Sequence, residues 1–346
     1  MTRAHLLRGL VAAGLVVAMS AFGVGVYQAA GYLKARHPQV QRPSQTTGPS
    51  LPGTIFVVQA GAIYRYSQGK FTQITSEAGW MQPAADPTGS RLVAVRRQVN
   101  LSDLYLLQLS GRAGPSLTHD SSTVVESNHW AFYPRFSPDG SQIFYDYDPK
   151  DPYNSYRVDL AIFASPAGAG AGTGTGSVQW TFPNQYTGGD VNPVPLRGGG
   201  LIYTRFSIDD QSNVHPQVWY QARPGSAGTP LTDLAADCLQ PAVSPDEQQL
   251  AMVCTHGRPL AAELTTARFY RATLSLGPTT VLVRGQLAAS PSFAPDGKTI
   301  AYLAPGGSGG GFQLWTVSAA PSTAPAPQAI SSALDLDAQS APVWIS

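Results

Sequence analysis

Short apolar stretches alternate with Gly- and Pro-rich turns along most of this chain, a pattern typical of an all-β protein. The clearest example is WAFYPRFSPDGSQIFYDY at residues 130–147. Apolar and polar side chains alternate before the turn at 137–140, and an apolar stretch resumes after it. In a Ser-Pro-Asp-Gly turn the proline presets φ, the aspartate bonds the local backbone and the glycine relieves the exit. This stretch therefore predicts two antiparallel strands joined by a tight turn.

The same pattern returns along the chain, each time with a proline in the first strand. These prolines are separated by 48 to 59 residues and are Pro83, Pro134, Pro193, Pro241, Pro291 and Pro342. A period in this range is typical of radially repeated blades of four short strands. A β-sandwich with chance repeats is the alternative, and it fits poorly because six copies stay in phase.

The two ends of the repeat region complement each other. Residues 54–75 supply the later strands of a blade without a proline-bearing strand, whereas residues 340–346 supply only that strand. The last strand is expected to complete the first blade, because closing the ring removes exposed sheet edges. The prediction is an all-β fold, a six-bladed β-propeller over residues 54–346.

The N-terminal segment, residues 1–37, predicts one transmembrane helix before the propeller. Residues 9–33 carry no charge and are long enough to span a bilayer as a helix. We interpret this segment as a signal anchor, with a signal peptide cleaved near residues 18–21 as the alternative. Residues 38–53 contain four prolines and are expected to form an extended linker.

Composition indicates which classes of partner and which cellular compartment to expect. Charged residues make up 12% of the chain, about half the usual share, and the net charge is +1. Nothing in this balance favours nucleic acid as a partner. Low charge and a pair of cysteines favour a single-pass protein of the cell membrane with its propeller on the extracytoplasmic side.

Cys238 and Cys254 are the two cysteines of the chain, and each lies eight residues from Asp246. A hairpin that turns at Asp246 would place them opposite each other, within reach of a disulfide bond. Two buried free thiols are the alternative reading. No cysteine spacing suggests a metal site, and neither a metal nor another cofactor is expected.

The turn motifs resemble the WD40-like (PD40) repeats of TolB-type β-propellers, seen also in the propeller of dipeptidyl peptidase IV relatives. Residues 136–140 and 293–297 match this motif closely, whereas 85–89 and 243–246 match it loosely. The copy at Pro193 has Leu-Arg-Gly-Gly-Gly in place of the motif. The resemblance implies a propeller over residues 54–346 and does not identify a ligand.

The connections between the second and third strands are predicted to be long in three adjacent copies, at residues 148–158, 207–216 and 256–267. Long loops on a rigid scaffold are where binding residues usually lie. Together with the strand that follows Trp130, they supply the predicted ligand-binding residues, which are Trp130, Tyr133, Arg135, Asp148, Tyr153, Asp209, Asp210 and His215.

No assembled catalytic constellation is evident, so no catalytic residue is assigned. The leading hypothesis is a membrane-tethered binding module for an envelope protein, a peptide or a glycan. The rival is a propeller hydrolase of the glycosidase or lactonase type that uses Asp146, Asp148, Asp209 and Asp210, with calcium as a possible cation. A purely structural envelope component is the third class.

Overall fold

The computed structural model describes residues 48–150, 159–168, 176–183, 187–307, 310–320 and 326–346. By its internal contacts the chain divides into two units, Met1–Gln41 and Arg42–Ser346, and all described residues belong to the second. The proposed anchor helix at 9–33 and the predicted site residue Tyr153 lie outside the described residues. Within the described ranges, no helix has the length and apolar character needed to cross a membrane.

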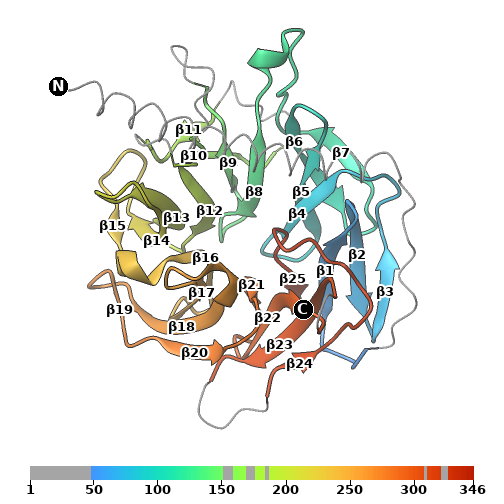
Figure 1. Ribbon diagram of the computed structural model, residues 1–346. Coiled ribbons are helices and arrows are strands. Elements are labelled where there is room, and N and C mark those ends of the chain that lie inside the picture. Colours follow the sequence, from blue (N-terminus) through green and yellow to red (C-terminus); the bar gives the residue numbers. More distant parts are fainter. Residues whose placement is uncertain (1–47, 151–158, 169–175, 184–186, 308–309, 321–325) are drawn as a thin grey trace, which may run out of the picture. The chain divides into compact units, whose positions relative to one another are not determined.

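The second unit is a ring of six antiparallel sheets, the blades of a β-propeller (Figure 1). Blade 1 contains β25 (Val343–Ile345), β1 (Thr54–Gln59), β2 (Ala62–Ser67) and β3 (Lys70–Gln73). Blade 2 contains β4 (Trp80–Ala85), β5 (Arg91–Arg97), β6 (Ser102–Gln108) and β7 (Ala113–Ser116). Blade 3 contains β8 (Ala131–Phe136), β9 (Gln142–Tyr147), β10 (Ala161–Pro166) and β11 (Val178–Gln179).

The remaining blades follow the same order from the centre of the ring outward. Blade 4 contains β12 (Asp190–Pro195), β13 (Leu201–Ile208), β14 (Val214–Gln221) and β15 (Thr229–Pro230). Blade 5 contains β16 (Cys238–Val243), β17 (Gln249–Cys254), β18 (Glu263–Tyr270) and β19 (Ser275–Leu276), and β20 (Thr280–Val283) also pairs with β18. Blade 6 contains β21 (Ala289–Phe293), β22 (Thr299–Pro305), β23 (Phe312–Ser318) and β24 (Gln328–Ala329).

The ring closes as the end complementarity predicts. Strand β25 pairs with β1, and Thr54 lies opposite Ile345. The indole Nε1 of Trp344 also donates a hydrogen bond to the carbonyl oxygen of Pro52 at 2.9 Å. The carboxyl-terminal strand thus becomes the innermost strand of blade 1 and completes its four strands.

A buried apolar cluster fills each of the six seams between adjacent blades. The alternation of side chains along a strand supplies two seams at once. In β1, for example, Ile55 and Val57 pack toward blade 6, whereas Phe56 and Val58 pack toward blade 2. The core is therefore a circle of six interfaces between sheets.

The innermost strands share a backbone irregularity at the residue before the proline. In five blades this residue has a positive φ of 47–57°, and the register with the neighbouring strand shifts there; the residues are Gln82, Tyr133, Asn192, Gln240 and Ser290. A left-handed residue before proline is strained, so it persists only where the surroundings hold it.

Those surroundings are the neighbouring blades. Each of the five left-handed backbone amides donates a hydrogen bond to a side-chain oxygen of the preceding blade, at 2.7–3.2 Å; the acceptors are Ser340, Gln82, Asp146, Thr204 and Gln240. A buried amide that its own sheet leaves unpaired needs such a partner. These hydrogen bonds therefore join successive blades near the centre of the ring.

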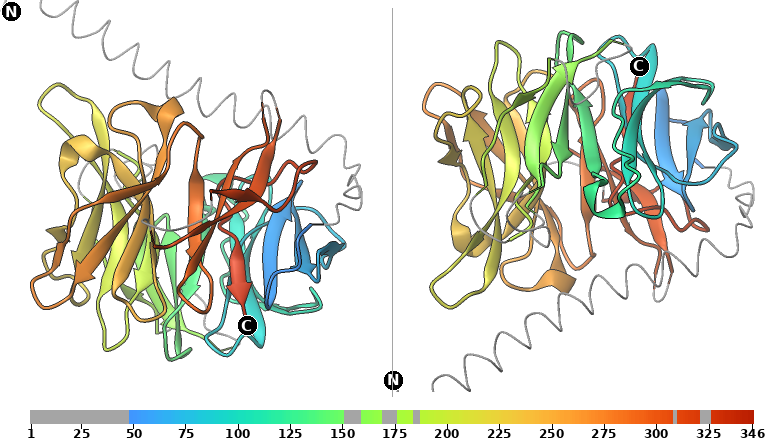
Figure 2. Two further views of the ribbon diagram at one scale, coloured as in Figure 1. Left: turned by 90° about the horizontal axis from the view of Figure 1, so that it is seen from below. Right: turned by 90° about the horizontal axis from the view of Figure 1, so that it is seen from above.

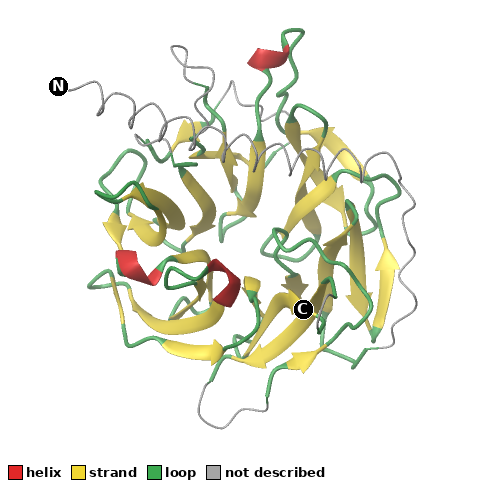
Figure 3. Ribbon diagram, viewed as in Figure 1, coloured by secondary structure: helices red, strands yellow, loops and turns green. Residues whose placement is uncertain are grey.

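The strand directions define two faces. The face that carries the tight turns between the first two strands of each blade is called the turn face. The opposite face carries the loops between the second and third strands and the connections between blades, and is called the loop face. The short helices η1 (Val125–Ser127), η2 (Leu234–Ala236) and η3 (Pro259–Ala261) lie in loop-face connections (Figure 3). The carboxyl terminus lies on the opposite, turn face (Figure 2).

Two loop boundaries differ from the sequence prediction. The predicted loop at 207–216 is only a five-residue connection, because Ser207 and Phe206 pair with His215 and Pro216. The predicted loop at 256–267 is also shorter, because β18 already begins at Glu263; this strand ends at Tyr270, and residues 271–274 form a turn with Leu274 at φ 50°. Residues 263–267 read Glu-Leu-Thr-Thr-Ala and contain one large apolar side chain, which gives little sequence signal for a strand.

Candidate functional site

The loop face is built on one recurring position, here called the entry pair. It consists of the two residues that face each other at the loop-face end of the two innermost strands, three residues before the proline. The entry pairs of blades 2 to 5 are Trp80–Arg96, Ala131–Tyr147, Asp190–Arg205 and Cys238–Cys254. Three of them are linked through their side chains, each by a different interaction.

In blade 4 the entry pair is a buried ion pair. The guanidinium of Arg205 donates from Nε and Nη2 to the two carboxylate oxygens of Asp190, each at 2.7 Å. Asp190 has no exposed surface, and burial raises its pKa against the opposing effect of Arg205. The guanidinium also lies 4.8 Å from the ring centroid of Trp219. This arrangement holds the end of the blade 4 hairpin together.

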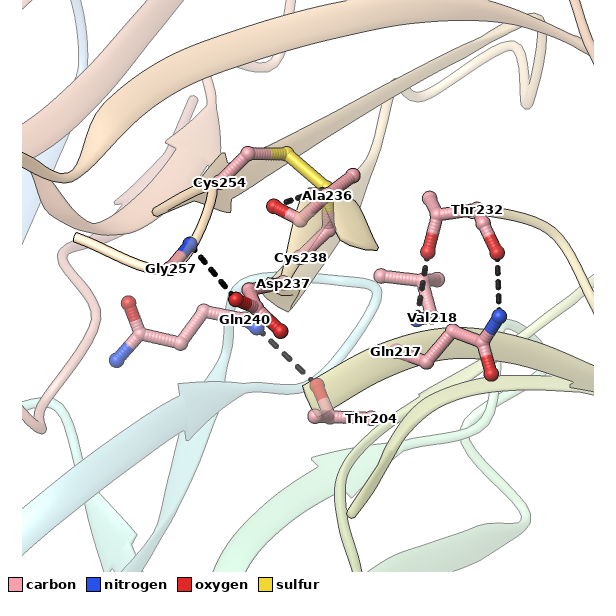
Figure 4. The surroundings of a disulfide bond; sticks show 10 residues. All are labelled: Thr204, Gln217, Val218, Thr232, Ala236, Asp237, Cys238, Gln240, Cys254 and Gly257. Carbon is pink, nitrogen blue, oxygen red and sulfur yellow. Dashed lines mark hydrogen bonds between the residues drawn. A yellow bond between two sulfur atoms is a disulfide. The ribbon is translucent and has the colours of Figure 1, made fainter. Parts of the chain in front are cut away.

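In blade 5 the entry pair is the disulfide bond (Figure 4). Cys238 and Cys254 lie directly opposite each other with their Cα atoms 4.1 Å apart, so the pair inferred from the spacing is bonded. The preceding residue, Asp237, has a left-handed backbone and accepts a hydrogen bond from the Gly257 amide at 2.8 Å. In blade 2 the link is a cation–π contact, with the Arg96 guanidinium 5.3 Å from the Trp80 ring.

His215 bridges two carboxylates next to these entry pairs. Its Nδ1 lies 2.7 Å from Asp237 Oδ1, and its Nε2 lies 3.1 Å from Asp209 Oδ2. Hydrogen bonds to Asp237 and Asp209 raise the pKa of His215, whereas hydrogen bonds from Asn213 and His215 hold the pKa of Asp209 well below its usual range. A protonated imidazole can donate to both carboxylates, so it ties the loop of blade 4 to the connection that leads into blade 5.

A second polar cluster lies between blades 2 and 3. Asp120 is 2% exposed, its Oδ1 accepts a hydrogen bond from the Tyr147 hydroxyl at 3.2 Å, and its Oδ2 has no hydrogen-bond partner. Burial, with the nearby charge of Asp103, raises the pKa of Asp120 to about 6. Within the described ranges, no group of three or more potential metal ligands is close enough to hold a metal ion.

The predicted site residues of blade 3 have separate surroundings. The ring of Trp130 stacks on Phe132 at 5.8 Å, with the Arg97 guanidinium 5.7 Å from the Trp130 ring. Asp148 is buried, and its carboxylate forms an ion pair with Lys150 Nζ at 2.8 Å.

Tyr133 and Arg135 lie on the innermost strand β8 and not in a loop. Tyr133 is the left-handed residue of this blade, and its amide donates to Gln82 Oε1. Burial lowers the pKa of the Arg135 guanidinium, and the charge of Asp146 opposes this effect. Asp146 is fully buried with a strongly raised pKa, so it faces the seam between blades and not a substrate.

The predicted site residues of blade 4 are brought together in part. Asp209 and His215 are hydrogen-bonded to each other, whereas Asp210 is exposed beside them. The prediction thus names one real cluster, Asp209 with His215, and misses its third member, Asp237. It also misses Asp120, Asp190 and Arg205. Asp190 could have been found, because it precedes Pro193 by the same three residues that separate Cys238 from Pro241.

Large apolar side chains are exposed mainly on the loop face. Ten are more than about a third exposed among the described residues, and eight of these lie in or beside loop-face connections; they are Val99, Val124, Val125, Phe182, Ile208, Val214, Leu234 and Leu260. Val99 and Leu260 are 89% and 90% exposed. The other two, Val178 and Tyr270, lie on an outer strand and at the turn-face end of β18. On the loop face, the strand ends therefore carry polar side chains, and the loops that project from them carry exposed apolar side chains.

Comparison with known proteins supports the fold. No protein-family model matches the chain, and no curated protein sequence does. Among solved structures, it is similar to TolB from Acinetobacter baumannii, with 16% identity, a TM-score of 0.62, and coverage of 86% of this chain and 67% of that one. A putative TolB from Agrobacterium tumefaciens is 14% identical, with a TM-score of 0.57 and coverage of 85% and 94%.

A propeller enzyme also resembles the chain. The gluconolactonase XC5397 from Xanthomonas campestris is 14% identical, with a TM-score of 0.51 and coverage of 84% of this chain and 90% of that one. Non-enzymatic and enzymatic propellers are thus similar to it at comparable identity, which is a likeness of fold alone. This chain therefore has the six-bladed β-propeller fold of TolB-type proteins.

Proposed function

We propose that the chain is a membrane-tethered, extracytoplasmic binding module that captures a protein or peptide partner through its loop face. The observation that carries this proposal is the distribution of exposed apolar side chains, eight of ten of which lie in or beside loop-face connections. Exposed apolar groups gathered on one surface are typical of interaction sites. Such a surface favours an apolar protein or peptide segment over a glycan, which would offer mainly hydroxyl groups.

The base of the loop face suits a binding scaffold. The entry pairs of blades 4 and 5 and the His215 contacts hold the strand ends from which Ile208, Val214 and Leu260 project. Loops on rigid strand ends bind with little loss of conformational entropy. The geometry therefore supports capture by a preformed surface.

Two features support the proposed compartment. Residues 9–33 are uncharged over a length that matches a bilayer, and a disulfide bond persists best outside the cytoplasm. The chain enters the propeller on the turn face, where the Gly48 amide donates to the carbonyl oxygen of Gly69. Both ends of the described chain, Gly48 and Ser346, therefore lie on the turn face.

Truncating the apolar tips tests the proposal. The variant Val99→Ser, Val125→Ser, Leu260→Ser should lose at least about tenfold in capture of its main crosslinked partner in intact cells, because each truncation removes contact surface worth about 1 kcal/mol. The matched control Val178→Ser, Tyr270→Ser removes exposed apolar groups elsewhere and should capture normally. Equal capture by both variants and the native chain would contradict the proposal.

A hydrolase is the second candidate, and the observation that favours it is Asp120. A carboxyl group with a pKa of about 6 and an oxygen without a hydrogen-bond partner suits a general acid. Three of the four carboxylates first considered are less suited because each already has a partner: Asp146 accepts from the Asn192 amide, Asp148 pairs with Lys150 and Asp209 with His215. The hydrolase would be supported if the native chain hydrolyses aryl glycosides or lactones and the variant Asp120→Asn does not. Absence of hydrolysis by the native chain would exclude this candidate function.

A further inference from the structure

The tight turns of the turn face seal the seams between blades. In blades 2, 3, 5 and 6 the first residue of the turn donates its amide to a carbonyl oxygen five residues later; these first residues are Asp86, Ser137, Ser244 and Ala294. A Cβ on Gly140 would lie 3.4 Å from Pro87, and one on Gly297 would lie 3.4 Å from Pro245. Between blades 2 and 3 and between blades 5 and 6, the glycine of one turn thus lies against the proline of the turn before it.

Blade 4 breaks this arrangement. Its turn is one residue shorter, because the amide of Leu196 donates to the carbonyl oxygen of Gly200, four residues later. It has no proline after Leu196, and a Cβ on Gly199 would meet nothing within 4 Å. The seam between blades 3 and 4 therefore lacks the turn-to-turn contact that closes other seams.

A pocket of about 390 Å³ opens at this unsealed seam. Pro138 and Pro195 line it on the two sides, and the buried side chains of Phe144, Trp180 and Leu196 form its apolar floor, with 3–8% of their surface exposed. The rings of Phe144 and Trp180 lie 5.2 Å apart, edge to face. Among the described residues, this seam also has the smallest buried apolar cluster of the six.

The charged side chains at the rim of this pocket indicate which class of ligand it can bind. Arg197 is exposed, and its guanidinium forms no hydrogen bond or ion pair within the described ranges, although its charge contributes to the lowered pKa of Asp246. Its backbone is fixed, because its amide donates to Glu247 and its carbonyl oxygen accepts from Arg271. Across the pocket, the Oδ1 of Asp139 already accepts hydrogen bonds from Ser137 and Ser141. These hydrogen bonds lower the pKa of Asp139 to about 2, so it remains a carboxylate, and the rim carries one negative charge at Asp139 and one positive charge at Arg197.

We propose that this pocket binds an aromatic organic anion, with its ring against Phe144 and Trp180 and its charged group at Arg197. The volume exceeds that of a single aromatic side chain and suits a small molecule, whose pockets begin near about 300 Å³. Arginine is suited to carboxylate and sulfonate groups because its planar fork donates two parallel hydrogen bonds. The site lies on the opposite face from the proposed partner surface and stands independently of it.

The probe for a direct test is 8-anilinonaphthalene-1-sulfonate, an aromatic anion whose fluorescence rises in apolar sites. One equivalent should bind to the native chain, and Arg197→Gln should weaken that binding about two- to fivefold, as loss of one exposed ion pair does. Asp139→Asn removes a negative charge from the same rim and should leave the affinity equal or higher. A fall in affinity for Asp139→Asn, or none for Arg197→Gln, would overturn the assignment of the anion to Arg197.

Restoring the sealed turn tests the pocket itself. Replacing the five residues 196–200 with the six-residue turn of blade 3, residues 137–142, should close the seam and remove the binding of the probe. Thermal unfolding of this variant checks that the propeller remains folded. The variant Val99→Ser, Val125→Ser, Leu260→Ser changes only the loop face and should bind the probe normally. Undiminished binding by a folded turn variant, or loss in the loop-face variant, would refute the site.

Discussion

Blades 4 and 5 adjoin each other and fasten the same pair of backbone positions in different ways. Blade 4 uses the buried ion pair of Asp190 and Arg205, and blade 5 uses the disulfide bond of Cys238 and Cys254. Both links lie at the loop-face end of the innermost hairpin, beside the strained residue that precedes the proline. The comparison indicates that the two strands need a side-chain link at this position, and that different types of bond can provide it. An ion pair responds to pH and a disulfide to redox conditions.

Breaking the blade 4 link is expected to have the largest effect. Arg205→Met leaves Asp190 buried without its cation and should lower the free energy of unfolding by about 3–5 kcal/mol near pH 8. The folded-state pKa of Asp190 is already raised and rises further without Arg205, so the loss should shrink as the pH falls, and it should be smallest below the unfolded pKa of about 3.9, where the carboxyl becomes neutral in both states. Urea unfolding at several pH values measures this.

A matched control separates burial from charge. Arg284→Met also removes an arginine from an ion pair, with Glu263, but the Arg284 side chain is 72% exposed. It should cost less than about 1 kcal/mol. Equal losses for Arg205→Met and Arg284→Met would show that the entry pair of blade 4 has no special role.

Breaking the blade 5 link should have a comparable but somewhat smaller effect. The double variant Cys238→Ser, Cys254→Ser opens a loop with a sequence separation of 16 and should cost about 3 kcal/mol. A reductant should lower the melting temperature of the native chain and leave that of this variant unchanged.

Exchanging the links sharpens the comparison further. Asp190→Cys, Arg205→Cys places the blade 5 chemistry in blade 4 and should recover stability relative to Arg205→Met under oxidising conditions only. Failure to form this second disulfide would mean that the two entry pairs are not geometrically equivalent.

The contacts of His215 should have the smallest effect. The folded-state pKa of His215 is raised, so its contribution is present below the unfolded value near 6.5 and is lost as the pH rises through the folded value. His215→Gln should therefore lower the melting temperature by about 1–2 °C at pH 6, with a difference that fades at higher pH. The exposed His119→Gln serves as the control, and a difference that grows with pH would contradict the interpretation.

The sequence repetition predicts much of the fold. Six phased prolines and complementary ends predict the blade count and the pairing of β25 with β1. The cysteine spacing also predicts the disulfide, because a hairpin turning at Asp246 leaves the two residues opposite each other. These features depend on backbone geometry, and every repeat encodes the same geometry in its sequence pattern.

The site is less predictable, because it depends on side chains that differ between repeats. The repeat marks the position of Asp190, three residues before Pro193, but nothing local marks Arg205 as its partner, since their contact requires the register of β12 and β13. Asp237 joins His215 from a different blade connection, 22 residues away in the sequence. The departure at 196–200 was visible as a missing turn motif, but the pocket beside it depends on how neighbouring blades pack.

Site-specific photo-crosslinking in intact cells tests the central claim most directly. A benzophenone side chain placed at Leu260 on the loop face, or at Tyr270 at the turn-face end of β18, reports which surface lies against a partner. We predict a defined crosslinked protein from position 260 and none from position 270. Crosslinking from position 270 alone, or equally from both positions, would contradict the assignment of the loop face as the binding surface.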